Sequence, residues 1–343
     1  MHNRAAIMYG THDVRLEEVP VPELGPKEVL VEIRAVGVCG SDIHYYEEGR
    51  IGSFVVREPL ILGHEPSGVV VALGDEATKH EVGERVTLEP GVPDGTCREC
   101  RAGRYNLCPN VSFFATPPIN GAFANYVSIH EDFALRLPDE ISDNAGALME
   151  PLSVGIWACR KANVRAGDHV LVTGAGPIGL LAMQVAFAQG ATDVTITDVA
   201  DERLEIARKT GATRALNVAE EPLEGSGLEV DVLIECSGNQ RALKDGILSI
   251  RPAGTAVVVG MGPEEETSVP LAFIQNKEIT LTGTFRYANT YPAAIELAAT
   301  GKVDLEAIIT GHYGLEEAEE ALQAGRKDPG NVKAMVIPNS PDS

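Results

Sequence analysis

The sequence predicts an α/β protein with two domains, one irregular and β-rich and the other built on a doubly wound parallel sheet. The first observation is length, because 343 residues are too many for one ordinary hydrophobic core. The second is a change of pattern near Pro151. Short strands separated by Gly and Pro precede it, whereas strands and helices alternate after it, which is typical of a parallel sheet covered by helices.

Hydrophobic periodicity predicts the individual elements. Strands are expected at Val29–Ala35, Gly68–Leu73, Arg85–Leu88, Asp168–Thr173, Asp193–Thr197, Val230–Cys236, Thr255–Gly260, Ile279–Gly283 and Lys333–Ile337. Helices are expected at Ser153–Lys161, Ile178–Gln189, Asp201–Lys209, Tyr291–Ala299 and Leu315–Ala324, and a charged loop at Pro263–Glu266. The alternation after residue 150 therefore predicts the parallel sheet.

The formal net charge of −22, from 50 acidic and 28 basic residues, argues against a nucleic-acid-binding protein. Two interpretations of this charge remain open. Ordinary solubility requires a net charge of only about 2–8 in magnitude for a small domain. Alternatively, the protein works in a high-salt cytoplasm, where screening to about 3 Å at 1 M salt suppresses repulsion between carboxylates. We favour the high-salt interpretation. The sequence is also poor in lysine, with nine lysines against 19 arginines.

No segment predicts a membrane span or a secretion signal. The longest apolar runs, such as Val170–Val172 and Gly254–Val259, are far shorter than the roughly 20 residues that cross a bilayer. Met1–Gly10 lacks the basic and then apolar pattern of a signal peptide. We therefore expect a cytoplasmic protein, in which clustered cysteines indicate a metal or catalysis before disulfides.

A glycine-rich turn follows one predicted strand and opens the next predicted helix, which Pro177 and Ile178 begin. Gly174 would make the tight turn, Gly176 would let the backbone approach a pyrophosphate, and Gly179 would let the helix pack close to the strand. The helix N-terminus then faces the phosphates. This context predicts a dinucleotide site.

The type of dinucleotide is predicted by an acidic residue at the end of the following strand. Asp198 stands 19 residues after Gly179, where a carboxylate can accept hydrogen bonds from the adenosine ribose. It would repel a 2′-phosphate, so NAD is favoured over NADP. Arg203 leaves an alternative open, because it could lie along the adenosine or support NADP binding.

Three potential zinc ligands lie in the first domain. Cys39, His64 and Glu65 offer a thiolate, an imidazole and a carboxylate, which are ligand types that catalytic zinc sites use. A fourth position left open would bind the reacting oxygen. Each residue alone is more often structural, so the prediction depends on the whole set.

These motifs and their order resemble the zinc-containing medium-chain dehydrogenase/reductase superfamily along the whole chain. The short motifs are Cys39–Asp42, Gly63–Glu65 and the dinucleotide glycines. Other stretches are similar to the sorbitol (polyol) dehydrogenases: His44–Tyr46, Gly49–Gly52, Phe54–Val56, Gly103–Leu107, Ala115–Pro118, Met149–Gly155 and Phe285–Tyr287. The resemblance implies a Rossmann sheet inserted in a GroES-like catalytic domain, with domains at 1–152 and 153–285 and a segment, 286–343, that returns to the first.

The resemblance also implies the site residues. A catalytic zinc would be held by Cys39, His64 and Glu65, with Glu150 binding the zinc or its water. Zinc would lower the pKa of the substrate hydroxyl, and the released proton would pass through Ser41 and His44 to water. The substrate pocket would include Tyr45, Phe113, Glu150, Arg286 and Tyr287, and the cofactor site would add Val259, Gly260, Met261, Thr284, Phe285 and Arg286.

Two alternatives remain for a second zinc site, one with the metal bound and one without it. The superfamily's structural lobe has four cysteines, of which this chain keeps Cys97, Cys100 and Cys108, whereas the first position is Asp94. A carboxylate can bind zinc, so a site with three thiolates and one aspartate is chemically reasonable. The alternative is a metal-free lobe with three reduced thiols.

The leading hypothesis is a zinc- and NAD-dependent enzyme that oxidises a secondary hydroxyl of a sorbitol- or xylitol-like polyol to a ketone. A threonine or butanediol dehydrogenase on the same scaffold is the nearest alternative, and a nucleotide-binding protein without turnover is another. The resemblance implies a homotetramer or homodimer. No nucleic-acid or membrane partner is expected.

Overall fold

The structure, a computed structural model, describes residues 1–262 and 266–339, so the first three residues of the expected Pro263–Glu266 loop lie outside the described residues. The chain forms two compact units. Unit 1 contains Met1–Glu150, Tyr291–Ile295 and Ile309–Ser343, and unit 2 contains Pro151–Thr290 and Glu296–Ile308.

The C-terminal segment 286–343 is thus divided between the units instead of returning to the first as a whole. Hydrogen bonds give the physical reason, because the Asp304 backbone N–H donates to Gln184 Oε1 at 2.7 Å within unit 2. Later in the segment, β20 (Lys333–Ile337) pairs with a strand of unit 1.

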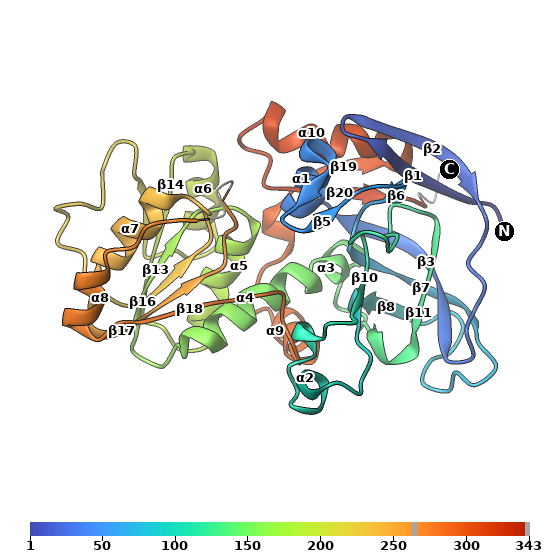
Figure 1. Ribbon diagram of the computed structural model, residues 1–343, viewed down its shortest axis with the longest axis horizontal. Helices are drawn as coiled ribbons and strands as arrows, with labels where there is room; N and C mark the ends of the chain where they lie inside the picture. The colour runs from blue at the N-terminus through green and yellow to red at the C-terminus, as the bar shows by residue number, and fades with distance from the viewer. Residues whose placement is uncertain (263–265, 340–343) are drawn as a thin grey trace. The chain divides into compact units, whose positions relative to one another are not determined.

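The larger sheet of unit 1 is built around β3 (Glu28–Gly37), most of whose residues are buried. The strand order is β12 (Ala134–Arg136), β8 (Arg85–Leu88), β7 (Glu65–Leu73), β3, β20 and β19 (Ile309–Gly314), with β11 (Tyr126–His130) also paired to β3. Strand β20 runs antiparallel to β3, with Met335 opposite Gly37. A strand from late in the chain therefore lies directly beside the central strand (Figure 1).

The remaining strands of unit 1 form smaller sheets. They are β1 (Asn3–Gly10), β2 (Asp13–Val19) and β6 (Leu60–Ile61) in one sheet, and the pairs β4 (Arg50–Ile51) with β5 (Phe54–Val55) and β9 (Gly91–Val92) with β10 (Ser112–Phe113). Its helices include α1 (Gly40–Glu48), α2 (Arg98–Arg101), α3 (Asp143–Ala147) and α10 (Ala318–Lys327).

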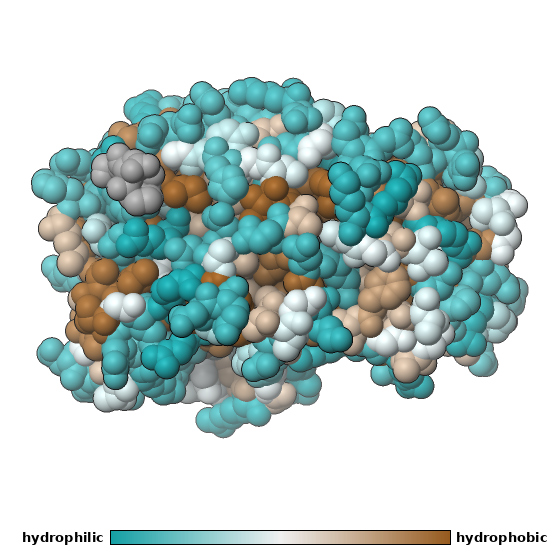
Figure 2. All heavy atoms as spheres, turned by 180° about the vertical axis from the view of Figure 1, so that it is seen from behind, coloured by the Kyte–Doolittle hydropathy of each residue, from teal (hydrophilic) through white to brown (hydrophobic). Residues whose placement is uncertain are grey.

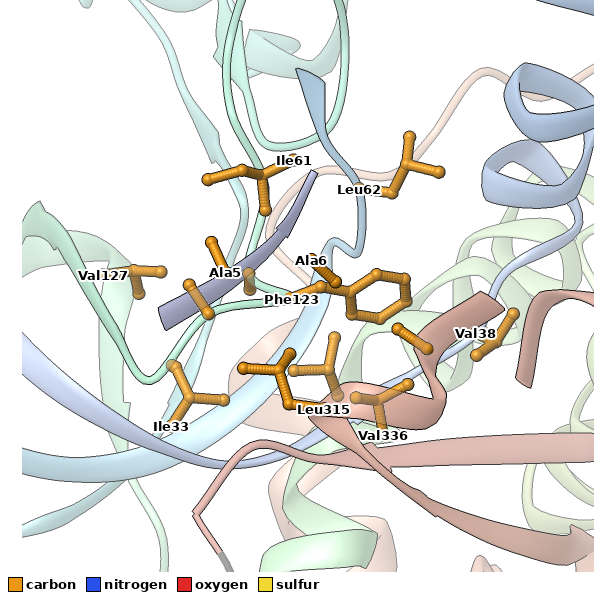
Figure 3. Packing of buried hydrophobic residues seen from close by; sticks show 14 of the residues in the cluster. Ala5, Ala6, Ile33, Val38, Ile61, Leu62, Phe123, Val127, Leu315 and Val336 are labelled. Carbon is orange, nitrogen blue, oxygen red and sulfur yellow. The ribbon is translucent and has the colours of Figure 1, made fainter. Parts of the chain in front are cut away.

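One hydrophobic cluster joins the elements of unit 1. In Figure 3 the Phe123 ring lies near Ala6 and above Leu315 and Val336, which come from distant parts of the sequence. All four residues are almost completely buried. Burial of such side chains from both ends of the chain stabilises the β-rich unit.

Unit 2 contains a parallel six-stranded sheet. The strand order is β15 (Arg214–Asn217), β14 (Asp193–Asp198), β13 (His169–Thr173), β16 (Val230–Glu235), β17 (Ile250–Val258) and β18 (Thr280–Gly283). The helices include α5 (Pro177–Ala188), α6 (Asp201–Lys209), α7 (Gln240–Leu248) and α8 (Leu271–Lys277), while α4 (Met149–Ala162) and α9 (Tyr291–Ala299) contain residues of both units. The strand order reverses between β13 and β16, which is the switch point of a doubly wound sheet (Figure 1).

The predicted fold class is confirmed, but many elements were not predicted individually. Before α4, only β3, β7 and β8 were predicted, and later in the chain β15, β19, α7 and α8 were missed. Strands β15 and β19 are short or mostly half-buried, so their alternation is weak. Helix α7 contains Gly246, and glycine lowers helix propensity by about 1 kcal/mol relative to alanine. Its Asn239 cap, whose side chain accepts from the Arg241 and Ala242 N–H groups, was the available signal. In the described part of the chain, no helix is long and apolar enough to cross a membrane.

Candidate functional site

The predicted zinc ligands meet where β3 ends and β7 begins. Gly37, the last residue of β3, is paired with Glu65, the first residue of β7. Cys39 follows as the N-cap of α1, and His64 immediately precedes β7. One ligand atom from each of Cys39, His64 and Glu65 lies within 4.8 Å of the other two. Sheet register therefore assembles the set.

The donor set fits a zinc ion. A soft thiolate, an imidazole and a carboxylate match a three-ligand catalytic centre with an open fourth position. His64 and Glu65 are buried, whereas Cys39 is half-buried. Glu150 does not belong to this group of close ligand atoms, although it is itself only 5% exposed.

Asp42 orients the imidazole of His64. Its fully buried carboxylate lies 3.3 Å from His64 Nδ1 and accepts hydrogen bonds of 3.0 Å from the Gly63 and Cys39 backbone N–H groups. Burial lowers the pKa of His64, but the charges of Asp42 and Cys39 outweigh it and raise that pKa well above its usual value. A carboxylate on Nδ1 leaves Nε2 for a metal.

Lys333 provides a counter-ion for Glu65. Its ammonium donates to both carboxylate oxygens, at 2.9 and 2.8 Å, and to the Val38 carbonyl oxygen at 2.9 Å. Lys333 is 2% exposed and Glu65 1%. Burial by itself lowers the pKa of Lys333. The negative charges of Glu65, Cys39 and Glu150 outweigh this effect and raise the pKa above its usual value, so the residue stays cationic. A buried cation thus stabilises a ligand carboxylate.

The predicted proton-transfer residues lie on α1. Ser41 stands in its first turn and is half-buried. The His44 side chain is 39% exposed, and its Nδ1 lies 3.8 Å from the Glu48 carboxylate. The helix thus carries two groups that can exchange protons, one beside Cys39 and one in contact with solvent.

One predicted pocket residue, Phe113, lies against the ring of a predicted ligand. Its ring centroid is 5.7 Å from that of His64. Phe113 and Tyr45 are both buried, at 7% and 4% exposure, in unit 1. Arg286 and Tyr287 belong to unit 2.

The predicted lobe also brings its four residues together. Ligand atoms of Asp94, Cys97, Cys100 and Cys108 lie within 4.8 Å of one another. Cys97 Sγ is 3.3 Å from Cys100 Sγ, and Asp94 Oδ1 is 3.5 Å from Cys100 Sγ. The Asp94 carboxylate occupies the position of a fourth donor.

Asp94 also organises the lobe's backbone. Its Oδ1 accepts hydrogen bonds from the Thr96 and Cys97 N–H groups at 2.8 and 2.9 Å, and its Oδ2 accepts from Asn110 Nδ2 at 2.8 Å. The bonds from Cys97, Asn110 and Thr96 hold the pKa of Asp94 well below its usual range. A permanently ionised carboxylate is a good oxygen ligand.

A buried acid adjoins the lobe. Glu89 is 7% exposed, and Tyr105, which lies between Cys100 and Cys108, donates its hydroxyl to Glu89 Oε1 at 2.7 Å. Burial raises the pKa of Glu89 to about 7, against the opposing effect of the Tyr105 bond. The contact fastens the lobe to the end of β8.

In unit 2, the glycine turn has the geometry that a dinucleotide site requires. Gly174 has a φ of +89°, which favours glycine, and Gly176 is the N-cap of α5 with Pro177 in its first turn. A Cβ atom at Gly179 would overlap the Gly174 carbonyl oxygen. Gly174 and Gly179 are therefore sterically required, and the N–H groups at the start of α5 are available to phosphates.

Asp198 is fixed beside this turn. Its Oδ2 accepts from the Ala175 N–H at 2.7 Å, and its Oδ1 accepts from Val199 and Ala200 at 2.8 and 3.0 Å. A cavity of about 530 Å³ adjoins it, and its lining includes Gly174, Gly176, Asp198 and Arg203 from the predicted set. Sequence reasoning missed Asn239 and Arg241, which also line it.

The other predicted cofactor residues follow neighbouring strands. Val259, Gly260 and Met261 come after β17, and Thr284–Arg286 come after β18. They do not line the cavity. Arg286 has a φ of +51°, and its guanidinium lies 4.9 Å from the Phe285 ring centroid. A left-handed arginine is an uncommon conformation and marks functional segments more often than ordinary ones.

Sequence reasoning also missed Asp42 and Lys333. Asp42 is the last residue of the Cys39–Asp42 motif and lies three residues after Cys39, at the start of a helix. That spacing is a capping signal, and it could have been used. Lys333 is 268 residues from Glu65, and no local pattern links them.

Comparisons with known proteins agree with this geometry. Residues 25–139 match the alcohol dehydrogenase GroES-like domain, and residues 177–300 match the zinc-binding dehydrogenase family. Sorbitol dehydrogenase of Bacillus subtilis is 43% identical over 98% of this chain and 97% of its own length. The Homo sapiens sorbitol dehydrogenase is 42% identical over 98% and 96%. The crystal structure of 2R,3R-butanediol dehydrogenase from Bacillus subtilis is similar with a TM-score of 0.88 and 32% identity, covering 98% of this chain and all of that one.

We predict that Lys333→Met will destabilise the protein by about 3–5 kcal/mol, because it leaves the Glu65 carboxylate buried without its cation. The measurement is the free energy of unfolding in urea. The control is Lys327→Met at an exposed position of α10, which should change it by less than about 0.5 kcal/mol. Equal effects of the two substitutions would contradict a structural role for the buried pair.

We predict that Glu89→Gln will become progressively more stabilising, relative to wild type, between pH 4.5 and about 7. The folded-state pKa is raised, so the favourable contribution of protonated Glu89 is complete below 4.5 and lost as the pH rises through 7. The stability difference should grow by up to about 3 kcal/mol, at about 1.4 kcal/mol per pKa unit. Unfolding in urea at pH 5 and pH 8 measures it. Glu58→Gln, at an exposed site, is the control, and a pH-independent difference for Glu89→Gln would refute the prediction.

Proposed function

The chain belongs to the zinc-binding dehydrogenase family, and on that premise we propose that it oxidises a secondary hydroxyl of a polyol to a ketone, with NAD as hydride acceptor. The observation that carries the proposal is the meeting of Cys39, His64 and Glu65 within 4.8 Å. Its support is the near-complete alignment with sorbitol dehydrogenases.

The catalytic zinc would be held by Cys39, His64 and Glu65, with Glu150 nearby to hold water or to serve as a further ligand. Zinc bound there would supply Lewis-acid chemistry to the substrate hydroxyl. Asp42 keeps the imidazole of His64 in the required tautomer. The Lys333 ammonium offsets the charge of the Glu65 carboxylate.

A proton must leave when an alcohol becomes a ketone. Ser41, on the first turn of the helix that Cys39 caps, would relay it, accepting this proton as its own hydroxyl proton passes through the nicotinamide ribose toward His44. His44 would release the proton to water, and its partial exposure and its contact with Glu48 support that role. Both residues act on protons without holding the metal.

Substrate recognition would combine apolar and polar groups. Phe113 would form an apolar wall beside His64, as the 5.7 Å ring separation supports. Tyr45 would add a hydroxyl, and Arg286 and Tyr287 would donate hydrogen bonds to vicinal hydroxyls. A polyol offers more hydroxyls to these donors than a simple alcohol does, and a site built to hydrogen-bond hydroxyls discriminates strongly against analogues that lack them.

The nucleotide would lie along Gly174, Gly176 and Gly179. The Asp198 carboxylate would accept hydrogen bonds from the ribose hydroxyls. It would repel a 2′-phosphate, which favours NAD over NADP. Three backbone N–H groups hold its carboxylate in place for that contact. Val259, Gly260, Met261, Thr284, Phe285 and Arg286 would line the path of the nicotinamide half.

The lobe formed by Asp94, Cys97, Cys100 and Cys108 would hold a second, structural zinc. Its support is the close approach of four donor atoms and the depressed pKa of Asp94, which keeps that group ionised. The Glu89 contact with Tyr105 would then connect the metal lobe to the sheet.

A butanediol dehydrogenase is the second candidate. It is supported by the 32% identity to the butanediol enzyme over nearly the whole chain. The polar Phe285–Tyr287 segment favours the polyol instead, because four-carbon diols offer fewer hydroxyls to pair with Arg286 and Tyr287.

A cytoplasmic homotetramer or homodimer is the proposed assembly. Its support is the edge strand β18, whose residues are half-buried or exposed in the chain alone and include Leu281, with Leu271 of α8 exposed as well. An unpaired strand edge is a template for pairing with a second copy.

The salt-adapted surface proposed from the −22 charge is consistent with the hydrophilic residues that dominate the face in Figure 2.

We predict that the protein will reduce NAD with sorbitol or xylitol at a higher kcat/KM than with threonine or butanediol, and with NAD better than with NADP. Cys39→Ser should bind NADH normally in a fluorescence titration and give no measurable ketone, because a weaker oxygen ligand replaces the thiolate. Cys159→Ser, at a buried cysteine outside both ligand groups, is the control and should keep turnover. Full activity after zinc removal with a chelator would exclude the proposal.

We predict that thermal stability and activity will rise steeply between low and molar chloride. At 0.01 M salt, repulsion between surface carboxylates extends over about 30 Å, and molar salt shortens this to about 3 Å. Because the effect is electrostatic, the melting midpoint should level off once screening is complete. A chloride series of melting midpoints and initial rates measures it. A flat or falling profile would remove the high-salt habitat from the proposal.

A further inference from the structure

Three loops converge at the switch point of the unit 2 sheet, where β13, β16 and β17 end. The glycine turn follows β13, Cys236–Asn239 follow β16, and Val259–Met261 follow β17. In doubly wound sheets, nucleotides bind at the carboxyl ends of strands at this point. The side chain that holds these loops together is Glu235, the last residue of β16, and it was not among the predicted site residues.

One carboxylate oxygen of Glu235 collects four donors. Its Oε1 accepts from the Ser237 N–H at 2.8 Å, the Gly238 N–H at 3.0 Å and the Thr173 hydroxyl at 3.3 Å. The Ser237 hydroxyl also donates to it. Because Thr173 ends β13, this oxygen connects the glycine turn to the loop after β16.

The main chain of Glu235 reaches the third loop. Its carbonyl oxygen accepts from the Val259 N–H at 2.8 Å and from the Gly260 N–H at 2.9 Å. A Cβ atom at Gly260 would approach Glu235 Oε2 to 2.9 Å. A single residue therefore contacts all three loops.

The three loops pack so closely that side-chain contacts cannot determine the spacing between their backbones. A Cβ atom at Gly174 would lie 3.0 Å from the Ser237 backbone, and one at Gly238 would lie 2.5 Å from the Met261 carbonyl oxygen. Both glycines have positive φ, +89° and +65°. Backbone lies against backbone here, so the hydrogen bonds to Glu235 determine the spacing.

The burial of Glu235 makes a purely structural role costly. It is 1% exposed, and burial raises its pKa against the opposing hydrogen bonds. The same strand carries Leu233 and Ile234, which are completely buried and apolar. A buried carboxylate is stabilised only by full hydrogen bonding, and an apolar residue is often at least as stabilising in such places.

We propose that Glu235 is a positioning residue for the dinucleotide, which sets the spacing between the pyrophosphate turn and the loop that carries the nicotinamide half. The inference rests on the proposed NAD binding. Glu235 acts through the backbone of these loops and does not line the cavity, whereas its neighbours Cys236 and Ser237 do. The adenosine half, which would bind at Asp198 and Arg203, depends less on this spacing, because Val259–Met261 do not line that cavity.

The test compares NADH with AMP, which carries only the adenosine half. Glu235→Leu, which leaves the Ser237 and Gly238 N–H groups unpaired, should weaken NADH binding at least about tenfold in a fluorescence titration. AMP binding, measured by displacement calorimetry, should stay within about threefold of wild type. Glu235→Gln keeps an acceptor oxygen and should restore NADH binding to within about threefold of wild type.

The control is Ile234→Val on the same strand, which removes one methyl group from a completely buried side chain and should leave both dissociation constants unchanged. If Glu235→Leu does not fold, Thr173→Val decides, with an expected threefold loss of NADH binding and unchanged AMP binding. Equal losses for both nucleotides, or none, would overturn the inference. A wild-type protein that does not bind NADH would instead refute the proposed function.

Discussion

The register of β3 is the constraint on which unit 1 depends. This strand pairs with β7, β11 and β20, and its end leads into the helix that Cys39 caps. Because Gly37 is opposite Glu65, a slip of one residue would turn the carboxylate to the other face of the sheet. Gly37 also lacks a Cβ atom, which would otherwise overlap the Glu65 carboxylate. The pairing of β3 with β7 therefore also determines where the predicted ligand Glu65 lies.

The same logic explains what the sequence could predict. Cys39, His64 and Glu65 were predictable because their residue types fit zinc and their motifs are local. The glycine turn was predictable because strand, turn and helix are adjacent in the chain. Lys333 was not, because its contact with Glu65 depends on β20 pairing beside β3, and β-sheet pairing over 268 residues leaves no periodic signal.

Glu235 was missed for a different reason. It ends a predicted strand and resembles any strand-terminal acid, since only the donors from Thr173, Ser237 and Gly238 distinguish it. Asp198 ends β14, on the other side of β13, and is also a carboxylate with a similar set of backbone donors. Asp198 lines the cavity, whereas Glu235 is buried under the loops, and only their positions in the strand order separate the two.

The distance along the chain between Glu65 and Lys333 also has a consequence for biosynthesis. At about 5–20 residues per second, translation of the intervening 268 residues takes about 13–54 s. During that time the complete unit 2 sheet emerges, while the carboxylate of Glu65 lacks its cation. A nascent chain therefore carries Cys39, His64 and Glu65 before the cation that offsets the glutamate's charge has been made. Pairing of β20 beside β3 is therefore a late step in completing this group of residues.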